Sequence, residues 1–152
     1  MSAHTSSETR LGARVRDHRA AGRPLLVPYL TAGFPDRNAT PRLMAELAKA
    51  GADILELGVP FSDPLADGPT IQGSSQAALD AGGSLDATLD ALRLFRAADT
   101  DTPVVLFTYL NPVLRYGVAD VLTDAAEAGA SGLLLTDLPV GADPELEARV
   151  RA

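Results

Sequence analysis

The sequence predicts a parallel α/β fold that corresponds to about the first four βα units of a (β/α)8 barrel. Three observations lead to this prediction. Strand-like apolar runs alternate with helical segments, the runs are apolar on both faces, and a helix–turn–strand pattern occurs twice, at residues 48–57 and 126–135. Strands that are apolar on both faces are typical of parallel sheets covered by helices.

An open, doubly wound sheet is the alternative to a barrel. No glycine-rich phosphate loop follows the first strand, where a dinucleotide-binding fold would have one, and this favours the barrel. Only about four strands fit into the 152 residues, whereas a (β/α)8 barrel needs roughly 250 residues. We therefore expect a flexible N-terminus at residues 1–7 and the N-terminal half of a barrel domain at residues 8–152, truncated within a helix.

The elements follow from local signals at their ends. Thr40 is the expected N-cap of a helix with Pro41 at its first position, and Ser84 is the expected N-cap of a helix to about residue 98. Asp143 and Pro144 are expected to begin the last helix. Pro28 suits a strand end or bulge better than a strand interior. The expected helices are 8–21, 40–50, 70–81, 84–98, 118–128 and 143–152, and the expected strands are 25–31, 53–58, 104–109 and 132–136.

Composition excludes several classes of function. The net charge of −7 disfavours nucleic-acid binding, which needs a basic surface. The chain has no cysteine, so disulfides and thiolate chemistry are absent. Residues 1–8 are polar, and no apolar run approaches the roughly 20 residues of a membrane span. We therefore expect a cytoplasmic protein without a membrane segment. His4 and His18, both in the N-terminal segment, are expected at the surface.

Glu56 is unusual because it lies inside the apolar strand 53–58. A carboxylate buried on such a strand loses hydration, which raises its pKa and suits it to proton transfer near neutral pH. Strand alternation places Ile54 and Glu56 on one face, and Leu55 and Leu57 on the other, toward the helices.

Polar side chains also stand at the carboxyl ends of all four strands, where active sites of parallel α/β folds lie. They are Thr31, Glu56, Tyr109 and Asp137. The alternative interpretation is that strands simply become polar where they reach the surface. Glu56 fits that interpretation least, because apolar residues continue beyond it.

The loop after Glu56 contains Asp63 and Asp67 among three prolines, which stiffen it. A loop of this length after a strand is a candidate lid or partner surface. Asp before Gly or Pro also commonly just makes a turn. The spacing of the two aspartates is not that of a calcium loop and no histidine is near, so no metal site is predicted.

A long motif spans this strand and loop. Residues 55–72, LELGVPFSDPLADGPTIQ, resemble the signature of the tryptophan synthase alpha chain family, and so do residues 27–36, VPYLTAGFPD. The segments FTYLNP at 107–112 and TDLP at 136–139 follow in the right order and spacing. The resemblance extends over residues 8–152.

The resemblance implies a (β/α)8 barrel of tryptophan biosynthesis that cleaves indole-3-glycerol phosphate into indole and glyceraldehyde 3-phosphate. It implies that Glu56 is the catalytic acid/base and Asp67 the catalytic aspartate. The substrate-binding candidates are Tyr29, Phe107 and Leu134, which match indole-pocket positions, together with the strand-end residues Tyr109 and Asp137.

The resemblance also implies a partner, the beta chain of an α2β2 assembly, met by the loop around Asp63 and Pro64. No cofactor is expected in this chain, and pyridoxal phosphate is expected only in the beta chain. The family's phosphate-binding glycines and serine come from later strands, so we expect this chain to be inactive alone and, with two free sheet edges, prone to associate. The alternatives are a non-catalytic fragment that retains only the beta-chain-binding loop, and a phosphosugar barrel enzyme of different chemistry.

Overall fold

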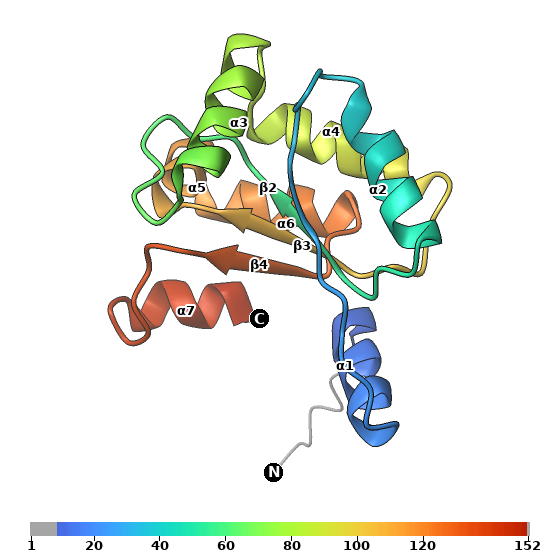
Figure 1. The fold of residues 1–152 in the computed structure, drawn as a ribbon. Coiled ribbons are helices and arrows are strands. Elements are labelled where there is room, and N and C mark those ends of the chain that lie inside the picture. The colour runs from blue at the N-terminus through green and yellow to red at the C-terminus, as the bar shows by residue number, and fades with distance from the viewer. Residues whose placement is uncertain (1–8, 152) are drawn as a thin grey trace.

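A computed structural model describes residues 9–151 of the chain. Strands and helices alternate through most of this part of the chain (Figure 1). None of the helices in residues 9–151 is long and apolar enough to cross a membrane. The elements are α1 (Arg10–Ala20), β1 (Tyr29–Thr31), α2 (Ala39–Lys49), β2 (Leu55–Gly58), α3 (Pro69–Asp80), α4 (Leu85–Arg96), β3 (Val104–Thr108), α5 (Leu110–Tyr116), α6 (Val118–Glu127), β4 (Gly132–Leu135) and α7 (Pro144–Arg151).

The four strands form one parallel sheet in the order β1-β2-β3-β4. The register places Tyr29, Glu56, Val105 and Gly132 in one row across the sheet, and a second row lies two residues further along each strand. Residues in one row of a parallel sheet point to the same face. We call the face that bears Glu56 the inner face, and the opposite face the outer face.

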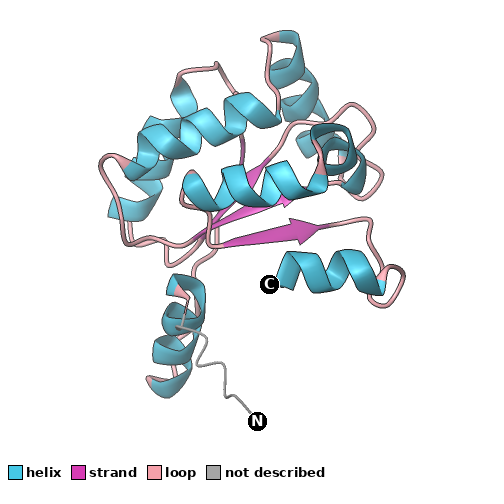
Figure 2. Ribbon diagram, turned by 180° about the vertical axis from the view of Figure 1, so that it is seen from behind, coloured by secondary structure: helices cyan, strands magenta, loops and turns pink. Residues whose placement is uncertain are grey.

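Helices cover the outer face, as Figure 2 shows from behind the view of Figure 1. Leu55, Leu57 and Leu106 of the sheet pack there against Met44 of α2 and Phe95 of α4, and all five are fully buried. Burial of each such side chain stabilises the fold by about 1.5–3 kcal/mol. The expectation that Leu55 and Leu57 face the helices is confirmed.

Helix α5 was not expected from the sequence. It begins directly after β3, and the Asp137 carboxylate accepts a hydrogen bond from its first backbone N–H, that of Leu110, at 2.7 Å. Val113 of α5 is buried in a second apolar cluster with Val59, Leu85 and Val121. The cap comes from beyond β4, which is why no local signal marks the start of this helix.

Two expected boundaries are corrected. The first strand begins at Tyr29 rather than at residue 25, although the Leu26 and Pro28 carbonyls already accept hydrogen bonds from the backbone next to and within β2. Pro28 therefore precedes the strand, as a strand-end proline should. Thr40 lies inside α2, whose cap is Asn38, and its hydroxyl accepts the Gly33 N–H at 2.8 Å instead.

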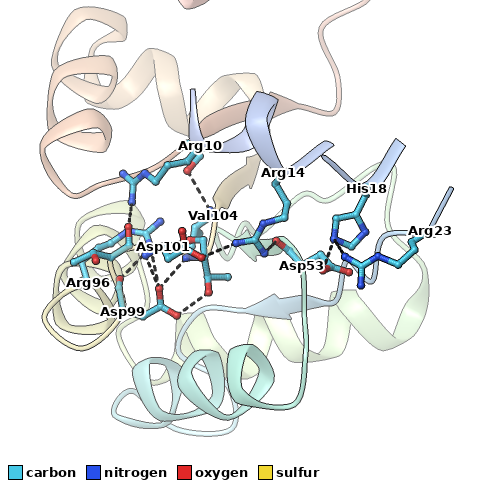
Figure 3. Close-up of polar contacts among 12 residues, drawn as sticks. Arg10, Arg14, His18, Arg23, Asp53, Arg96, Asp99, Asp101 and Val104 are labelled. Carbon is cyan, nitrogen blue, oxygen red and sulfur yellow. Dashed lines mark hydrogen bonds and ion pairs between the residues drawn. The ribbon is translucent and has the colours of Figure 1, made fainter. Parts of the chain in front are cut away.

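Helix α1 lies at the amino ends of the strands, away from the sheet layers (Figure 1). Figure 3 shows how its polar side chains reach the turns below the sheet. Arg14 donates to the Asp53 carbonyl at 2.9 Å and to the Asp101 carboxylate at 2.7 Å. His18 is buried, with Nε2 2.9 Å from Asp53 Oδ1 and Nδ1 3.1 Å from the Pro24 carbonyl. The expectation that His18 is a surface residue is wrong, and His4 lies outside the described residues.

Arg96 joins α4 to the turn before β4. Its guanidinium donates to the carbonyls of Gly129 at 3.0 Å and Thr102 at 2.8 Å, and its burial lowers its pKa (Figure 3). Gly129 has a φ of +89°, and a Cβ there would lie 2.9 Å from Arg96 Nε. Both facts require glycine at this turn.

Candidate active site

The inner face of the sheet brings Glu56 next to Tyr29 of the neighbouring strand. Glu56 is half-buried, between a fully buried Leu55 and a fully buried Leu57. The expectation of a carboxylate buried on both faces is therefore corrected. Helices cover the outer face, whereas the described residues leave the inner face partly open around Glu56.

Tyr29 packs across Gly58 toward β3. Its ring meets the Phe107 ring edge to face, with centroids 5.3 Å apart at 77°. A Cβ at Gly58 would lie 2.0 Å from the Tyr29 hydroxyl oxygen, so only glycine allows this approach. Burial raises the pKa of Tyr29, and the negative charges of Asp67 and Glu56 act in the same direction. Tyr29 and Phe107 thus form an aromatic wall beside Glu56.

The Asp67 side chain is held by Tyr109. The Tyr109 hydroxyl donates to Asp67 Oδ2 at 3.0 Å and accepts the Ala66 N–H at 3.0 Å. Tyr109 is itself buried and stacks on Phe61 at the start of the loop, with centroids 5.3 Å apart. Burial raises the pKa of Tyr109, and the hydrogen bond to the Asp67 carboxylate adds to this effect. The hydroxyl therefore stays protonated and remains a donor to Asp67.

The rest of the loop turns outward. Asp67 is tied back to α3 through its carbonyl, which accepts from Gln72 Nε2 at 2.9 Å. Asp63 is exposed and accepts from the Ser62 hydroxyl at 2.5 Å, while Leu65 at the tip is 90% exposed. Local hydrogen bonds thus hold a loop whose tip presents an apolar side chain to solvent.

The other predicted residues lie at the same end of the sheet or on the same face. Leu134 shares a row with Phe107, which places it on the inner face. Leu133 and Leu135 point the other way and pack against the helix-side clusters. Asp137 is exposed and caps α5.

Glu56 and Asp67 thus offer two carboxylates in different settings. One stands on a strand beside an aromatic wall, and the other is fixed on a loop by a tyrosine donor. Within residues 9–151, no three His, Cys, Asp or Glu side chains lie close enough together to ligate a metal ion. The chemistry available from these side chains is proton transfer and the stabilisation of developing positive charge.

Sequence reasoning missed three residues of this site: Gly58, Phe61 and Gln72. A signal existed only for Gly58, because glycine inside a strand often marks a close approach of another group. Phe61 and Gln72 act through contacts with Tyr109 and the Asp67 carbonyl, which the sequence does not reveal.

Carboxylates and tyrosines at the carboxyl ends of parallel strands, with helices outside, are the arrangement of the (β/α)-barrel class. The comparisons with known proteins agree. Residues 15–152 match the family model described as tryptophan synthase alpha chain. The chain is 47% identical over 146 residues to the tryptophan synthase alpha chain of Nitratidesulfovibrio vulgaris (strain DP4). This match covers 96% of this chain and 56% of that protein. The chain belongs to the tryptophan synthase alpha chain family.

Solved structures give the same result. The crystal structure of tryptophan synthase subunit alpha from Legionella pneumophila str. Paris superimposes with a TM-score of 0.91 at 42% identity, covering 94% of this chain and 55% of that one. A structure described as the tryptophan synthase α2β2 complex of Pyrococcus furiosus gives a TM-score of 0.78 at 42% identity, covering 84% and 53%. The fold expected from the sequence is confirmed, and the chain spans about half the length of these relatives.

Proposed function

We propose that this chain supplies the carboxylate half of an active site that cleaves indole-3-glycerol phosphate into indole and glyceraldehyde 3-phosphate. The observation that carries the proposal is the inner-face arrangement of Glu56 beside the Tyr29–Phe107 wall, with Asp67 fixed nearby on the loop by Tyr109. Membership of the family supports the choice of substrate.

Glu56 is proposed to move the protons in this retro-aldol cleavage. Its protonated carboxyl donates a proton to C3 of the indole ring, which gives an indolenine-like tautomer with positive charge on the ring nitrogen. The carboxylate that results takes the proton from the glycerol hydroxyl next to C3. As that oxygen forms the aldehyde, the C–C bond breaks and its electron pair returns to the ring, leaving indole and the aldehyde product.

Asp67 is proposed to accept the indole N–H and to stabilise the positive charge that develops on that nitrogen. This role requires an ionised carboxylate in a fixed position. The hydrogen bond from the Tyr109 hydroxyl fixes one carboxylate oxygen, which leaves the other for the substrate. Tyr29, Phe107 and Leu134 of the inner face provide the apolar surface for the indole ring.

The reaction needs no cofactor in this chain, because the two carboxylates account for each proton and charge. We propose that pyridoxal phosphate is bound by the beta chain and not by this chain. The same proposal includes a cytoplasmic location for the protein. Groups that bind the substrate phosphate are proposed to lie in strands beyond these four. We therefore expect the 152-residue chain alone to have no lyase activity.

A chimera tests the enzymatic proposal. Residues 1–152 replace the matching part of the Nitratidesulfovibrio vulgaris relative, and cleavage of indole-3-glycerol phosphate is followed by indole release. The chimera should be active, and Glu56→Gln should abolish turnover while the fold and circular dichroism spectrum stay unchanged. Near-normal turnover of Glu56→Gln would refute the acid/base assignment.

A second candidate function is beta-chain binding without catalysis. It is favoured by the outward loop with its 90% exposed Leu65 next to exposed Asp63, and by the α2β2 complex described for the Pyrococcus furiosus relative. Titration of a beta chain with the 152-residue chain, wild type and Leu65→Asp, measures this directly. Binding that is lost in Leu65→Asp, together with an inactive chimera, would identify this second function, and absence of binding by the wild-type chain would exclude it.

A further inference from the structure

Two side-chain hydroxyls connect β1 to α3. Thr31 at the carboxyl end of β1 is buried, and its Oγ1 lies 2.7 Å from Oγ of Ser74. The Ser74 hydroxyl donates to the Ile71 carbonyl, in the first turn of α3, at 2.9 Å. Because a carbonyl can only accept and a serine has one hydroxyl proton, Thr31 is the donor to Ser74. The hydrogen bonds therefore run in one direction, from the strand into the start of the helix.

Thr31 stands on the inner face, next to the aromatic wall. It pairs with Gly58 in the register of the sheet, and the Tyr29 hydroxyl lies over Gly58, where a Cβ would be 2.0 Å away. Burial raises the pKa of Tyr29, and a hydrogen bond with the Thr31 side chain acts against this effect. Thr31 thus lies between the wall that borders Glu56 and the helix that follows the Asp67 loop.

The Asp67 loop leads directly into α3. Gln72, in the first turn of the helix, donates to the Asp67 carbonyl through Nε2 at 2.9 Å. The Ile71 carbonyl that accepts from Ser74 belongs to the same turn. A contact that fixes this turn on β1 therefore also fixes the end of the loop that carries Asp67.

We propose that Ser74 is a positioning residue of this active site: its contact with Thr31 holds the Asp67 loop to β1, while Tyr109 holds the loop to the end of β3. Strand β2, which carries Glu56, lies between these two strands in the sheet. The loop is therefore fixed on both sides of Glu56. All five residues lie inside the region that matches the family model, and strands beyond β4 supply none of these contacts.

The consequence for turnover rests on the proposed function. Asp67 has to be in place before positive charge develops on the indole nitrogen, because a preorganised carboxylate stabilises that charge without rearranging during the reaction. A loop that is attached only through Tyr109 would have to be ordered in each catalytic cycle. Ser74 touches neither the substrate nor the reacting atoms in this proposal, so its effect on the rate passes through Asp67.

A serine inside a helix often bonds to a preceding carbonyl with no role beyond the helix itself. Thr123 of α6 is such a case, because it is exposed and its hydroxyl donates to the Ala119 carbonyl at 3.0 Å. Ser74 differs because its oxygen also receives a hydrogen bond from Thr31, 43 residues earlier in the chain. Thr123 therefore provides a matched control for the loss of a helix hydroxyl.

Amide exchange is the first test, in the full-length chimera with the Nitratidesulfovibrio vulgaris relative. Thr31→Val keeps the shape of the side chain but removes its hydroxyl, and Ser74→Ala removes the hydroxyl that it binds. Each variant should accelerate exchange of the Ala66 and Gln72 amides about 5-fold or more beyond the change in global stability, because the loop and the first turn of α3 open more often. Thr31→Ser, which keeps a hydroxyl, and Thr123→Ala should leave both amides unchanged.

Cleavage of indole-3-glycerol phosphate by the same variants is the second test. Thr31→Val and Ser74→Ala should each lower kcat/KM about 10-fold, mostly through kcat, whereas Thr31→Ser should stay near wild type. The double variant Thr31→Val, Ser74→Ala should be no slower than the slower single variant, because both changes remove the same hydrogen bond.

Three results would overturn the proposal: equal losses in Thr31→Ser and Thr31→Val, additive losses in the double variant, or unchanged exchange at Ala66 and Gln72. A wild-type chimera without lyase activity would instead refute the proposed function. The exchange measurements would then still decide whether Ser74 holds the loop.

Discussion

The Tyr109 hydroxyl donates a 3.0 Å hydrogen bond to Asp67 Oδ2 and thereby connects the end of β3 to the loop after β2. The same oxygen accepts the Ala66 N–H, so one side chain fixes both the backbone and the carboxylate of the loop. Since Tyr109 is buried and lies on the framework of the sheet, the position of Asp67 is determined by the rigid part of the fold rather than by the loop.

Tyr109→Phe should release this loop. The change removes the donor to Asp67 and the acceptor of Ala66 N–H, and should lower the free energy of unfolding by about 1–3 kcal/mol. Amide exchange at Ala66 should accelerate beyond the change in global stability. Tyr116→Phe is the control, because it removes a tyrosine hydrogen bond, 2.5 Å long to Asp124, that involves neither Ala66 nor Asp67. Unchanged Ala66 exchange in Tyr109→Phe would contradict the assignment.

Gly58→Ala should disturb the aromatic wall. The new Cβ would lie 2.0 Å from the hydroxyl oxygen and 2.4 Å from Cζ of Tyr29, so the ring must move, at a cost of about 1–3 kcal/mol of stability. Urea unfolding measures the loss, and near-ultraviolet circular dichroism reports the ring. In a Tyr29→Ala background most of the penalty should disappear.

The control for that experiment is Gly73→Ala. Gly73 lies in α3 and a Cβ there would meet nothing within 4 Å. This variant should gain about 0.5–1 kcal/mol from helix propensity. A Gly58→Ala variant as stable as Gly73→Ala would show that the Tyr29 approach is not a constraint on the fold.

Asp99 should make stability depend on acid pH. Partial burial raises its pKa, but hydrogen bonds from the Thr102 hydroxyl at 2.7 Å and from the Thr102 and Asp101 backbone outweigh this, and the net pKa lies below its usual value. A lowered folded-state pKa stabilises the fold above about pH 4, where the unfolded group is ionised, and the contribution is lost as the pH falls through the folded-state value.

Asp99→Asn should accordingly cost about 1–2 kcal/mol at pH 7, and the difference from wild type should shrink toward pH 2. Urea unfolding across this range measures it. Asp90→Asn removes only an exposed pair with Arg93 and should change stability by less than about 0.5 kcal/mol. A constant difference for Asp99→Asn at all pH values would argue against the role of its charge.

Arg14→Ala should loosen α1 from the base of the sheet. The guanidinium binds the Asp53 carbonyl and the Asp101 carboxylate, and its loss should cost about 1–2 kcal/mol and raise amide exchange within α1 selectively. Arg19→Ala, at an exposed position of the same helix, should stay within about 0.5 kcal/mol of wild type. Equal exchange rates in the two variants would contradict the anchoring role.

The parts of the fold that local signals determine could be predicted. Ser84 caps α4 by accepting the Ala87 N–H at 3.1 Å, and Asp143 accepts the Leu146 N–H before α7, both as their positions in the sequence indicate. The alternation of Leu55, Glu56 and Leu57 predicted that the two leucines share a face opposite to Glu56, because side chains alternate along a strand, and the leucine face is the one that the helices cover.

The parts that depend on distant residues could not be predicted. Helix α5 is completed by Asp137, and His18 is buried by its pairing with Asp53. The first strand is short because only Tyr29–Thr31 pair with β2, and such pairing depends on the position of the other strand. The half-burial of Glu56 depends on which residues cover the inner face of the sheet. The roles expected for Glu56 and Asp67 came from a long sequence motif. The hydrogen bond from Tyr109 to Asp67 could be found only from the three-dimensional structure.

The attachment of α1 has a consequence for the order in which the chain is assembled. Its anchors lie 39 residues ahead at Asp53, 87 ahead at Asp101, 90 ahead at Thr100 and 119 ahead at Gly129. During synthesis from the N-terminus, this helix leaves the ribosome before the other helices of residues 9–151, yet its last anchor is synthesised only after three strands. Long-range contacts of this kind form late, after the loop entropy has been overcome. Helix α1 is thus expected to complete its docking only after residues as far along as Gly129 have been synthesised.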